Sequence, residues 1–154
     1  DSLLDLSGWS LADATRTRHI FPQGSLLAAG ETLIVFGGGS PSLSQGTWQT
    51  ASTGTLSLNN SGDSVFLYDA GGALIEQVDY GSIAGFDESI VRSPETTGEL
   101  WVKHSSLSGA AGRVQSAGYL VNPPDRVAAV PEPMTLCSVL TGLGLLFRLR
   151  CLNG

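Results

Sequence analysis

Cysteine is almost absent from this chain. The sequence contains only Cys137 and Cys151, and both lie near the C-terminal end. A disulfide framework is therefore excluded for the rest of the protein. We expect two unpaired thiols, and lipidation of a cysteine beside a membrane is the less favoured alternative.

Charge is also scarce, and positive charge most of all. Charged residues make up 14% of the chain, against about 25% in a typical domain, and the net charge is −6. Two of the eight basic residues, Arg148 and Arg150, lie at the C-terminal end, so residues 1–133 carry six basic residues against fourteen acidic ones. Phosphate backbones attract basic surfaces, so nucleic acid is disfavoured as a partner. Arg16 and Arg18 are the only close basic pair in the body.

No amphipathic helical pattern and no repeat of fixed period precede the C-terminal region. The chain instead has 20 glycines and short apolar segments separated by turn residues. This pattern predicts an all-β sandwich or barrel. The expected strands are Gly8–Asp13, Arg16–Phe21, Thr32–Phe36, Ser64–Tyr68, Leu74–Tyr80, Ser89–Arg92 and Leu100–His104.

Three connections complete this prediction. Asp69-Ala70-Gly71-Gly72 joins two expected strands in the clearest hairpin of the chain. Leu26 to Gly30 reads as a connector, and Gly37 to Thr55 reads as a long surface loop. We expect a β-domain over residues 1–121, a linker over 122–130 that contains Pro123-Pro124, and a separate tail over 131–154.

The tail has three features in order. Pro131-Glu132-Pro133 comes first, then fourteen largely apolar residues from Met134 to Phe147, then Arg148 and Arg150. As a helix, fourteen residues would span about 21 Å, short of the ~30 Å hydrocarbon core of a bilayer. The arginines would hold its end at the cytoplasmic face. A short hydrophobic helix of this kind suits transient anchoring better than a permanent span.

This arrangement resembles the PEP-CTERM sorting signal. Pro131, Glu132 and Pro133 match its motif, and Arg148 and Arg150 match its basic cluster, although Leu149 interrupts that cluster. The resemblance implies an exosortase-type processing enzyme as a transient partner. It also implies an exported precursor anchored in the inner membrane of a Gram-negative bacterium and then released to the cell surface or extracellular matrix. Because no signal peptide precedes Asp1, we expect a fragment or a mature product.

The body resembles a lamin-tail domain over about residues 3–120. The segments that carry the resemblance are Asp5–Asp13, Phe21–Gly24, Leu27–Glu31, Asn60–Val65, Leu67–Asp69, Gly72–Gly81, Ser89–Arg92 and Ser105–Arg113. The resemblance implies an immunoglobulin-like β-sandwich in which Trp9 supplies a buried anchor. The family's usual first strand is missing here, which would leave an exposed sheet edge able to pair with another chain.

Candidate catalytic and ligand-binding residues are few. His19 and His104 are expected on the surfaces of strands, and Ser105 beside His104 lies in no G-x-S-x-G turn. Asp79, Asp87 and Glu88, with Asp63 or Asp69, could meet near one end of the sandwich. They match no calcium-loop spacing, so solvated turn carboxylates are favoured.

Two further motifs suggest binding more than chemistry. Gly37-Gly38-Gly39-Ser40 lacks the lysine and helix of a phosphate-binding loop, so we expect a flexible loop. Trp48 is the candidate for surface contact, and Trp101 is expected in the core. We therefore expect neither catalytic residues nor a resident metal or cofactor.

The sequence thus predicts a non-catalytic interaction or structural module of the bacterial envelope or exopolymer matrix. Its partner would be an envelope protein or a matrix polymer. The alternative is an accessory binding domain of a larger secreted hydrolase whose catalytic part lies upstream of Asp1. A calcium-stabilised adhesive domain is a weaker third possibility.

Overall fold

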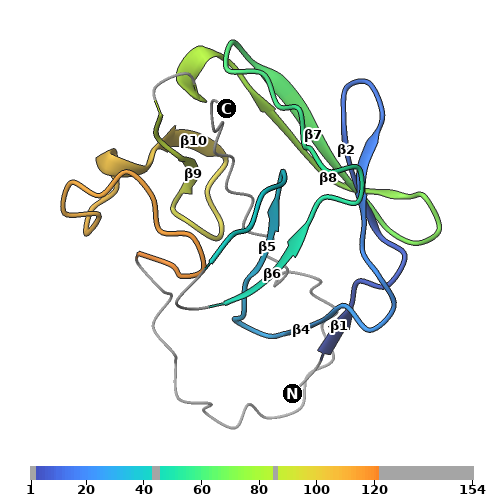
Figure 1. Cartoon of the computed structure of the whole chain (residues 1–154). Helices are drawn as coiled ribbons and strands as arrows, with labels where there is room; N and C mark the ends of the chain where they lie inside the picture. Colours follow the sequence, from blue (N-terminus) through green and yellow to red (C-terminus); the bar gives the residue numbers. More distant parts are fainter. Residues whose placement is uncertain (1–2, 43–45, 85–86, 122–154) are drawn as a thin grey trace, which may run out of the picture.

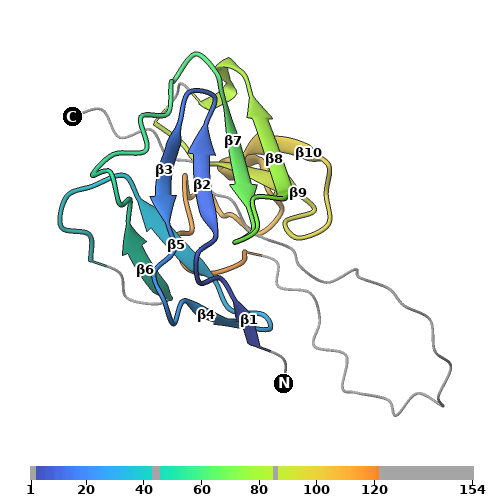
Figure 2. The same cartoon turned by 90° about the vertical axis from the view of Figure 1, so that its right-hand side faces the viewer.

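The largest sheet is a four-stranded antiparallel sheet with the order β3-β2-β7-β8. The computed structural model describes residues 3–42, 46–84 and 87–121. Its strands are β2 (Ser10–Asp13), β3 (Thr17–Ile20), β7 (Asp63–Tyr68) and β8 (Leu74–Tyr80). Figure 1 shows this sheet nearly edge-on, and Figure 2 shows it face-on.

Three two-stranded sheets accompany it. The first pairs β1 (Leu3–Asp5) with β4 (Leu26–Ala28). The second pairs β5 (Leu33–Phe36) in parallel with β6 (Thr47–Thr50). The third pairs β9 (Ile90–Ser93) with β10 (Leu100–Lys103). The β5-β6 and β9-β10 pairs lie behind the four-stranded sheet in Figure 2 and form a second layer.

The core lies between the layers because apolar residues alternate along the strands. In β7, Val65 and Leu67 are buried while Phe66 and Tyr68 are only half-buried, so one face turns inward. Trp9 and Trp101 are partly buried and pack against the core, as the sequence indicates for both. The buried cluster comprises Leu6, Leu11, Phe21, Val65, Leu67, Val78, Tyr80, Ala84 and Ile90. The described part of the chain is all-β apart from two short 3-10 turns, η1 (Ser82–Ala84) and η2 (His104–Ser106).

Most predicted strands are confirmed to within two or three residues, and Leu74–Tyr80 matches β8 at both ends. Two predicted connections are wrong. The segment Gly37–Thr55 contains β6, and Leu26–Gly30 contains β4. Strand β6 is polar apart from Trp48, and β4 is apolar but only three residues long, so neither shows the alternation of an independent strand. Each forms because a partner strand elsewhere in the chain offers backbone hydrogen bonds, which a local pattern does not reveal.

Candidate functional site

A buried polar cluster lies where β3 faces β6. His19 is 2% exposed, and its Nε2 lies 2.8 Å from Gln49 Oε1. Gln49 Nε2 donates to Ser25 Oγ at 2.9 Å, and Ser25 Oγ donates to the Pro22 carbonyl at 2.8 Å. On the other side of the ring, the Ser52 amide donates to His19 Nδ1 at 3.2 Å. The chain of contacts joins segments that are distant in sequence.

These contacts assign the proton on His19. A backbone amide can only donate, so Nδ1 must hold a lone pair. The proton therefore sits on Nε2 and is donated to Gln49 Oε1. Burial lowers the pKa of His19, and the hydrogen bond with Gln49 offsets only part of that effect. His19 is thus a neutral structural histidine.

The prediction that both histidines lie at the surface is wrong. His19 is oriented inward because it lies directly opposite the buried Leu11 in the β2–β3 register, and opposed side chains share a face of the sheet. His104 is 0% exposed and begins η2 instead of ending a strand. Both rings are buried at little cost because each has hydrogen-bond partners for both nitrogens.

His104 ties the segment after β10 to the rest of the fold. Its Nδ1 lies 2.7 Å from the Arg113 carbonyl oxygen, and its Nε2 lies 2.9 Å from Ser116 Oγ. The carbonyl can only accept, so Nδ1 carries the proton and the Ser116 hydroxyl donates to Nε2. In serine hydrolases the nucleophilic serine makes the same hydrogen bond with the histidine that acts as its base. Both side chains are 0% exposed, however, so no substrate can reach them.

Ser105 is placed apart from the His104 ring. Its amide donates to Glu88 Oε1 at 2.6 Å. Burial raises the pKa of Glu88, but hydrogen bonds from Ser105 and the nearby charge of Lys103 outweigh it, so that pKa lies below its ordinary value. Glu88 therefore stays ionised and fixes the start of η2.

Asp13 and Arg18 form a buried ion pair on the inner side of β2 and β3. Arg18 Nε donates to Asp13 Oδ2 at 2.7 Å, and the amides of Thr15 and Arg16 both donate to Asp13 Oδ1 at 2.8 Å. Burial raises the pKa of Asp13, but the hydrogen bonds from Arg18 and Thr15 hold it well below its usual range. The pair closes the β2–β3 turn. An Asp followed two residues later by Thr is the sequence signal that could have indicated this turn.

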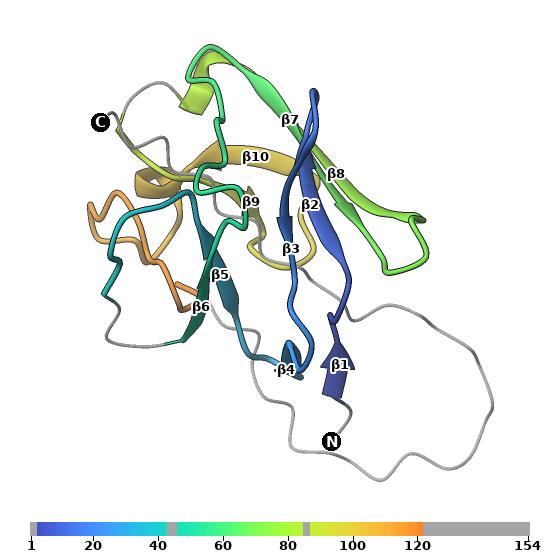
Figure 3. The ribbon, with the colours of Figure 1, turned by 45° about the vertical axis from the view of Figure 1, so that its right-hand side comes forward.

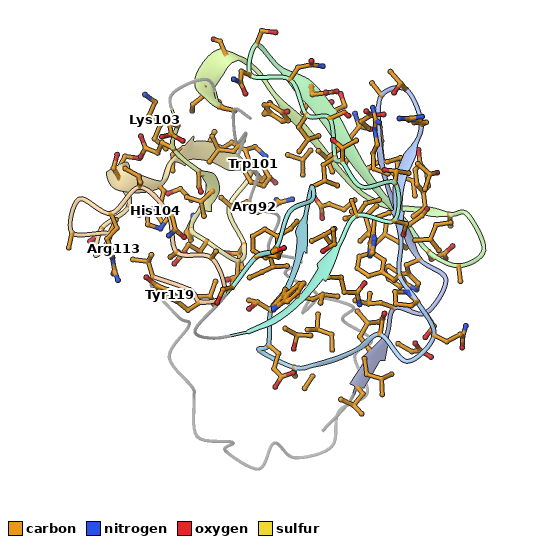
Figure 4. The ribbon with its side chains drawn as sticks, viewed as in Figure 1. Arg92, Trp101, Lys103, His104, Arg113 and Tyr119 are labelled. Carbon is orange, nitrogen blue, oxygen red and sulfur yellow. The ribbon has the colours of Figure 1, made fainter. Side chains whose placement is uncertain are left out.

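Arg92 joins the two layers of the sandwich. It forms an ion pair with Glu76 on β8, and its guanidinium carbon lies 5.0 Å from the ring centroid of Trp101 on β10. Figure 4 shows Arg92 and Trp101 on the β9-β10 side. Arg113 packs over Tyr119 at 5.6 Å further along the same side. The basic side chains of this region are thus engaged with neighbouring aromatic rings and carboxylates.

The register brings Asp63 and Asp79 to the same end of the β7–β8 pair, because Asp63 pairs with Tyr80 and Asp79 pairs with Ser64. Asp63 and Asp69 lie at opposite ends of β7, and Asp69 accepts the amides of Gly71 and Ala73 within the hairpin. Asp79 accepts hydrogen bonds from Ser64 and Gln77. In residues 3–42, 46–84 and 87–121, no three His, Cys, Asp or Glu side chains are grouped to hold a metal ion.

The remaining candidates are surface features. Trp48 is 43% exposed on β6, which confirms it as the exposed tryptophan. Gly37 and Gly38 follow β5, and a Cβ on Gly38 would lie 2.6 Å from the Gly54 carbonyl oxygen, so these glycines permit close packing of two loops. A hollow of about 440 Å³ beside the β9–β10 turn is lined by Ser93, Pro94, Glu95, Thr96, Thr97, Ser106, Leu107 and Ser108.

The predicted sorting residues Pro131, Glu132, Pro133, Arg148 and Arg150 lie outside the described residues. The same holds for the linker and for both cysteines. In the part of the chain that is described, no helix is long and apolar enough to cross a membrane.

A comparison with protein families gives a match over just more than half of the chain. A family model described as the lamin tail domain matches residues 1–82, which is 82 of 154 residues. The matched segment contains strands β1 to β8 and therefore the whole four-stranded sheet. No curated protein and no solved structure matches the chain significantly.

Proposed function

We propose, on the premise that this chain belongs to the lamin tail domain family, that it is an exported, surface-displayed interaction module of the bacterial envelope. The family is one of immunoglobulin-like, non-enzymatic domains, so an interaction role follows for residues 1–82. The family match to the four-stranded sheet is the observation that supports the interaction role, and the motif at residues 131–133 supports the export. Its partner would be an envelope protein or a matrix polymer.

The burial of both histidines supports a non-catalytic role. His19 and His104 are the side chains best suited to acid–base chemistry near neutral pH. Both are at most 2% exposed, and each ring has both nitrogens in hydrogen bonds. They stabilise loops, and neither lines the hollow beside the β9–β10 turn.

The acidic surface supports protein or matrix contact over nucleic acid. Residues 1–133 carry six basic residues against fourteen acidic ones. Two of the basic side chains, Arg18 and Arg92, are already paired with carboxylates. Tight, salt-sensitive binding of the chain to duplex DNA would contradict the proposal.

The tail, residues 131–154, supplies the proposed sorting signal. Pro131, Glu132 and Pro133 would be recognised by an exosortase-type processing enzyme while the segment up to Arg148 and Arg150 holds the precursor in the inner membrane. The body would then be released to the cell surface or extracellular matrix.

Protease treatment of intact cells tests whether the tail directs the protein to the cell surface. The chain is fused to a secretion signal and expressed in a Gram-negative bacterium that has an exosortase. We expect the parent and the control Glu31→Ala to be digested on intact cells, and Glu132→Ala to stay in the inner-membrane fraction. Equal surface exposure of Glu132→Ala and the parent would exclude the sorting role of the motif.

A further inference from the structure

We propose that the outer edge of β8 binds an extended peptide with basic and apolar side chains, which adds to the four-stranded sheet as a fifth strand. The inference rests on the proposed interaction role, and it is independent of export and of the tail. The inference specifies a peptide as the partner of the module and the β8 edge as its binding site.

The two edges of the sheet differ. The β3 edge is covered by the segment after β6: the Ile20 amide donates to Ser52 Oγ at 3.1 Å, and the Thr53 amide donates to the Arg18 carbonyl at 3.2 Å. For the β8 edge, no described residue outside the sheet forms a hydrogen bond to the backbone of residues 75–79. Figure 3 shows β8 at the rim of the sheet with β7 on one side only.

The register of β7 and β8 shows which backbone groups of β8 can bind an additional strand. The Asp69 amide donates to the Ala73 carbonyl at the hairpin, so the odd-numbered residues of β7 face β8. Their partners include Glu76 and Val78. The amides and carbonyls of the residues between, Gln77 and Asp79, therefore point away from β7. Backbone groups in this position bind an added strand in the way that peptide-recognition domains do.

The charge on this edge selects the partner. Asp79 is exposed, and its carboxylate accepts hydrogen bonds from Ser64 and Gln77. Within the described residues Asp79 forms no ion pair, so its charge is available to a cation on a neighbouring strand. A second copy of the chain would instead bring together two edges of a protein with net charge −6.

The other end of the edge is apolar. Leu74 and Ile75 are 51% and 43% exposed where β8 leaves the hairpin. A peptide that places an apolar side chain beside them and a basic one beside Asp79 would complement both features. Main-chain hydrogen bonds would supply affinity, and these two contacts would supply specificity.

A peptide of palindromic pattern tests the proposal without a choice of strand direction. The probe is acetylated and amidated Val-Thr-Lys-Thr-Lys-Thr-Val, and its control replaces both lysines with glutamate. Amide hydrogen exchange of the 154-residue chain is followed by NMR. At a probe concentration about ten times its Kd, we expect exchange at Gln77 and Asp79 to slow about tenfold. The glutamate peptide should leave both amides unchanged.

Two variants locate the contact. Gln77→Pro removes an edge amide that forms no ladder hydrogen bond, so the fold tolerates it while strand addition is blocked. Asp79→Lys should weaken the lysine probe at least about tenfold and allow the glutamate peptide to bind. Glu31→Lys makes the same charge change far from the edge and should have no effect. If Gln77→Pro does not fold, the binding of the two peptides to Asp79→Lys tests the proposal without it.

Three outcomes would overturn the proposal. Protection of Gln77 and Asp79 in the free chain at every concentration would show that the chain covers its own edge. Protection that rises with protein concentration would assign the edge to a second copy. Absence of any protection by the lysine probe would exclude the peptide site. In that case the proposed interaction role would still stand if the chain bound envelope protein or matrix polymer.

Discussion

The chain has one half that matches the family, residues 1–82, and one that follows it, residues 87–121, and each half contains a buried histidine. The two rings carry their proton on opposite nitrogens. His19 accepts at Nδ1 from the Ser52 backbone amide and donates from Nε2. His104 donates from Nδ1 to the Arg113 carbonyl and accepts at Nε2 from the Ser116 hydroxyl. Both rings tie a loop to a strand pair, but the group that faces the accepting nitrogen differs.

The partner at the accepting nitrogen makes the difference. The accepting nitrogen of His104 faces only the Ser116 hydroxyl among its hydrogen-bond partners, whereas that of His19 faces both the backbone amide and the hydroxyl of Ser52, each at 3.2 Å. A backbone amide cannot turn, so the Ser52 N–H disfavours a proton on His19 Nδ1. The lowered pKa of His19 therefore places an acid-sensitive group in the half of the sandwich that also contains the family match.

The Asp13–Arg18 pair should give the largest effect in the half that matches the family. Asp13→Ala leaves the Arg18 side chain, 8% exposed, without its counter-charge. We expect the free energy of unfolding to fall by about 3–5 kcal/mol, measured by urea denaturation. Asp5→Ala is the control, because Asp5 is exposed and its hydrogen bonds are local ones from Ser7. A loss below about 1 kcal/mol would show that the pair behaves as a surface salt bridge.

His104→Ala is the corresponding change in the other half. It leaves the Arg113 carbonyl and the Ser116 hydroxyl without their partner, which should cost about 2–4 kcal/mol. The loss should be local, so amide exchange should accelerate at Ala110 more than at Leu67 of the main sheet. Val114→Ala, at an exposed side chain, should leave both rates unchanged. Equal acceleration at both amides would show that the two halves unfold as one unit.

The sequence predicts local elements of this fold well and long-range contacts poorly. The hairpin of β7 and β8 follows from alternation and from Asp69 with its glycines, and both determinants are local. Strand β6 was missed because Thr47–Thr50 is polar and forms by pairing in parallel with β5. Its hydrogen bonds depend on a partner that is distant along the chain.

The candidate residues show the same limit. Trp48 was placed correctly because a tryptophan in a polar segment has no apolar neighbours with which to be buried. His19 was misplaced because its burial depends on Gln49 and Ser25, which no local pattern connects to it. Polar residues in strands are assigned to the surface by default, and only the tertiary network shows that burial is tolerated.

Acid should destabilise the protein through His19 before it affects the carboxylates. The pKa of His19 in the folded state lies below its ordinary value of 6.5, so the unfolded state takes up the proton first. The contribution of neutral His19 is complete above pH 6.5 and decreases as the pH falls below it. Asp13 and Glu88, whose folded-state pKa values are also lowered, act in a separate window near pH 4 and below.

Unfolding free energies at pH 7 and pH 5 test whether His19 responds to acid before the carboxylates do. The parent should lose stability between the two values, and His19→Gln should lose less because it has no ring to protonate. An unchanged pH dependence in His19→Gln would mean that the acid-sensitive group lies elsewhere.

The Arg92–Glu76 pair should give the smallest effect, although it bridges the two layers. The side chains of Arg92 and Glu76 are 18% and 26% exposed, so water and salt screen their attraction. A double-mutant cycle with Arg92→Met and Glu76→Gln should give a coupling energy below about 1 kcal/mol, decreasing further in 1 M salt. Arg92→Met keeps an apolar side chain against Trp101, so the cycle reports the charge and not the packing. A coupling above about 2 kcal/mol that resists salt would show that the layers are joined by a desolvated ion pair. The buried Asp13–Arg18 pair would then cease to be the distinctive electrostatic contact of this fold.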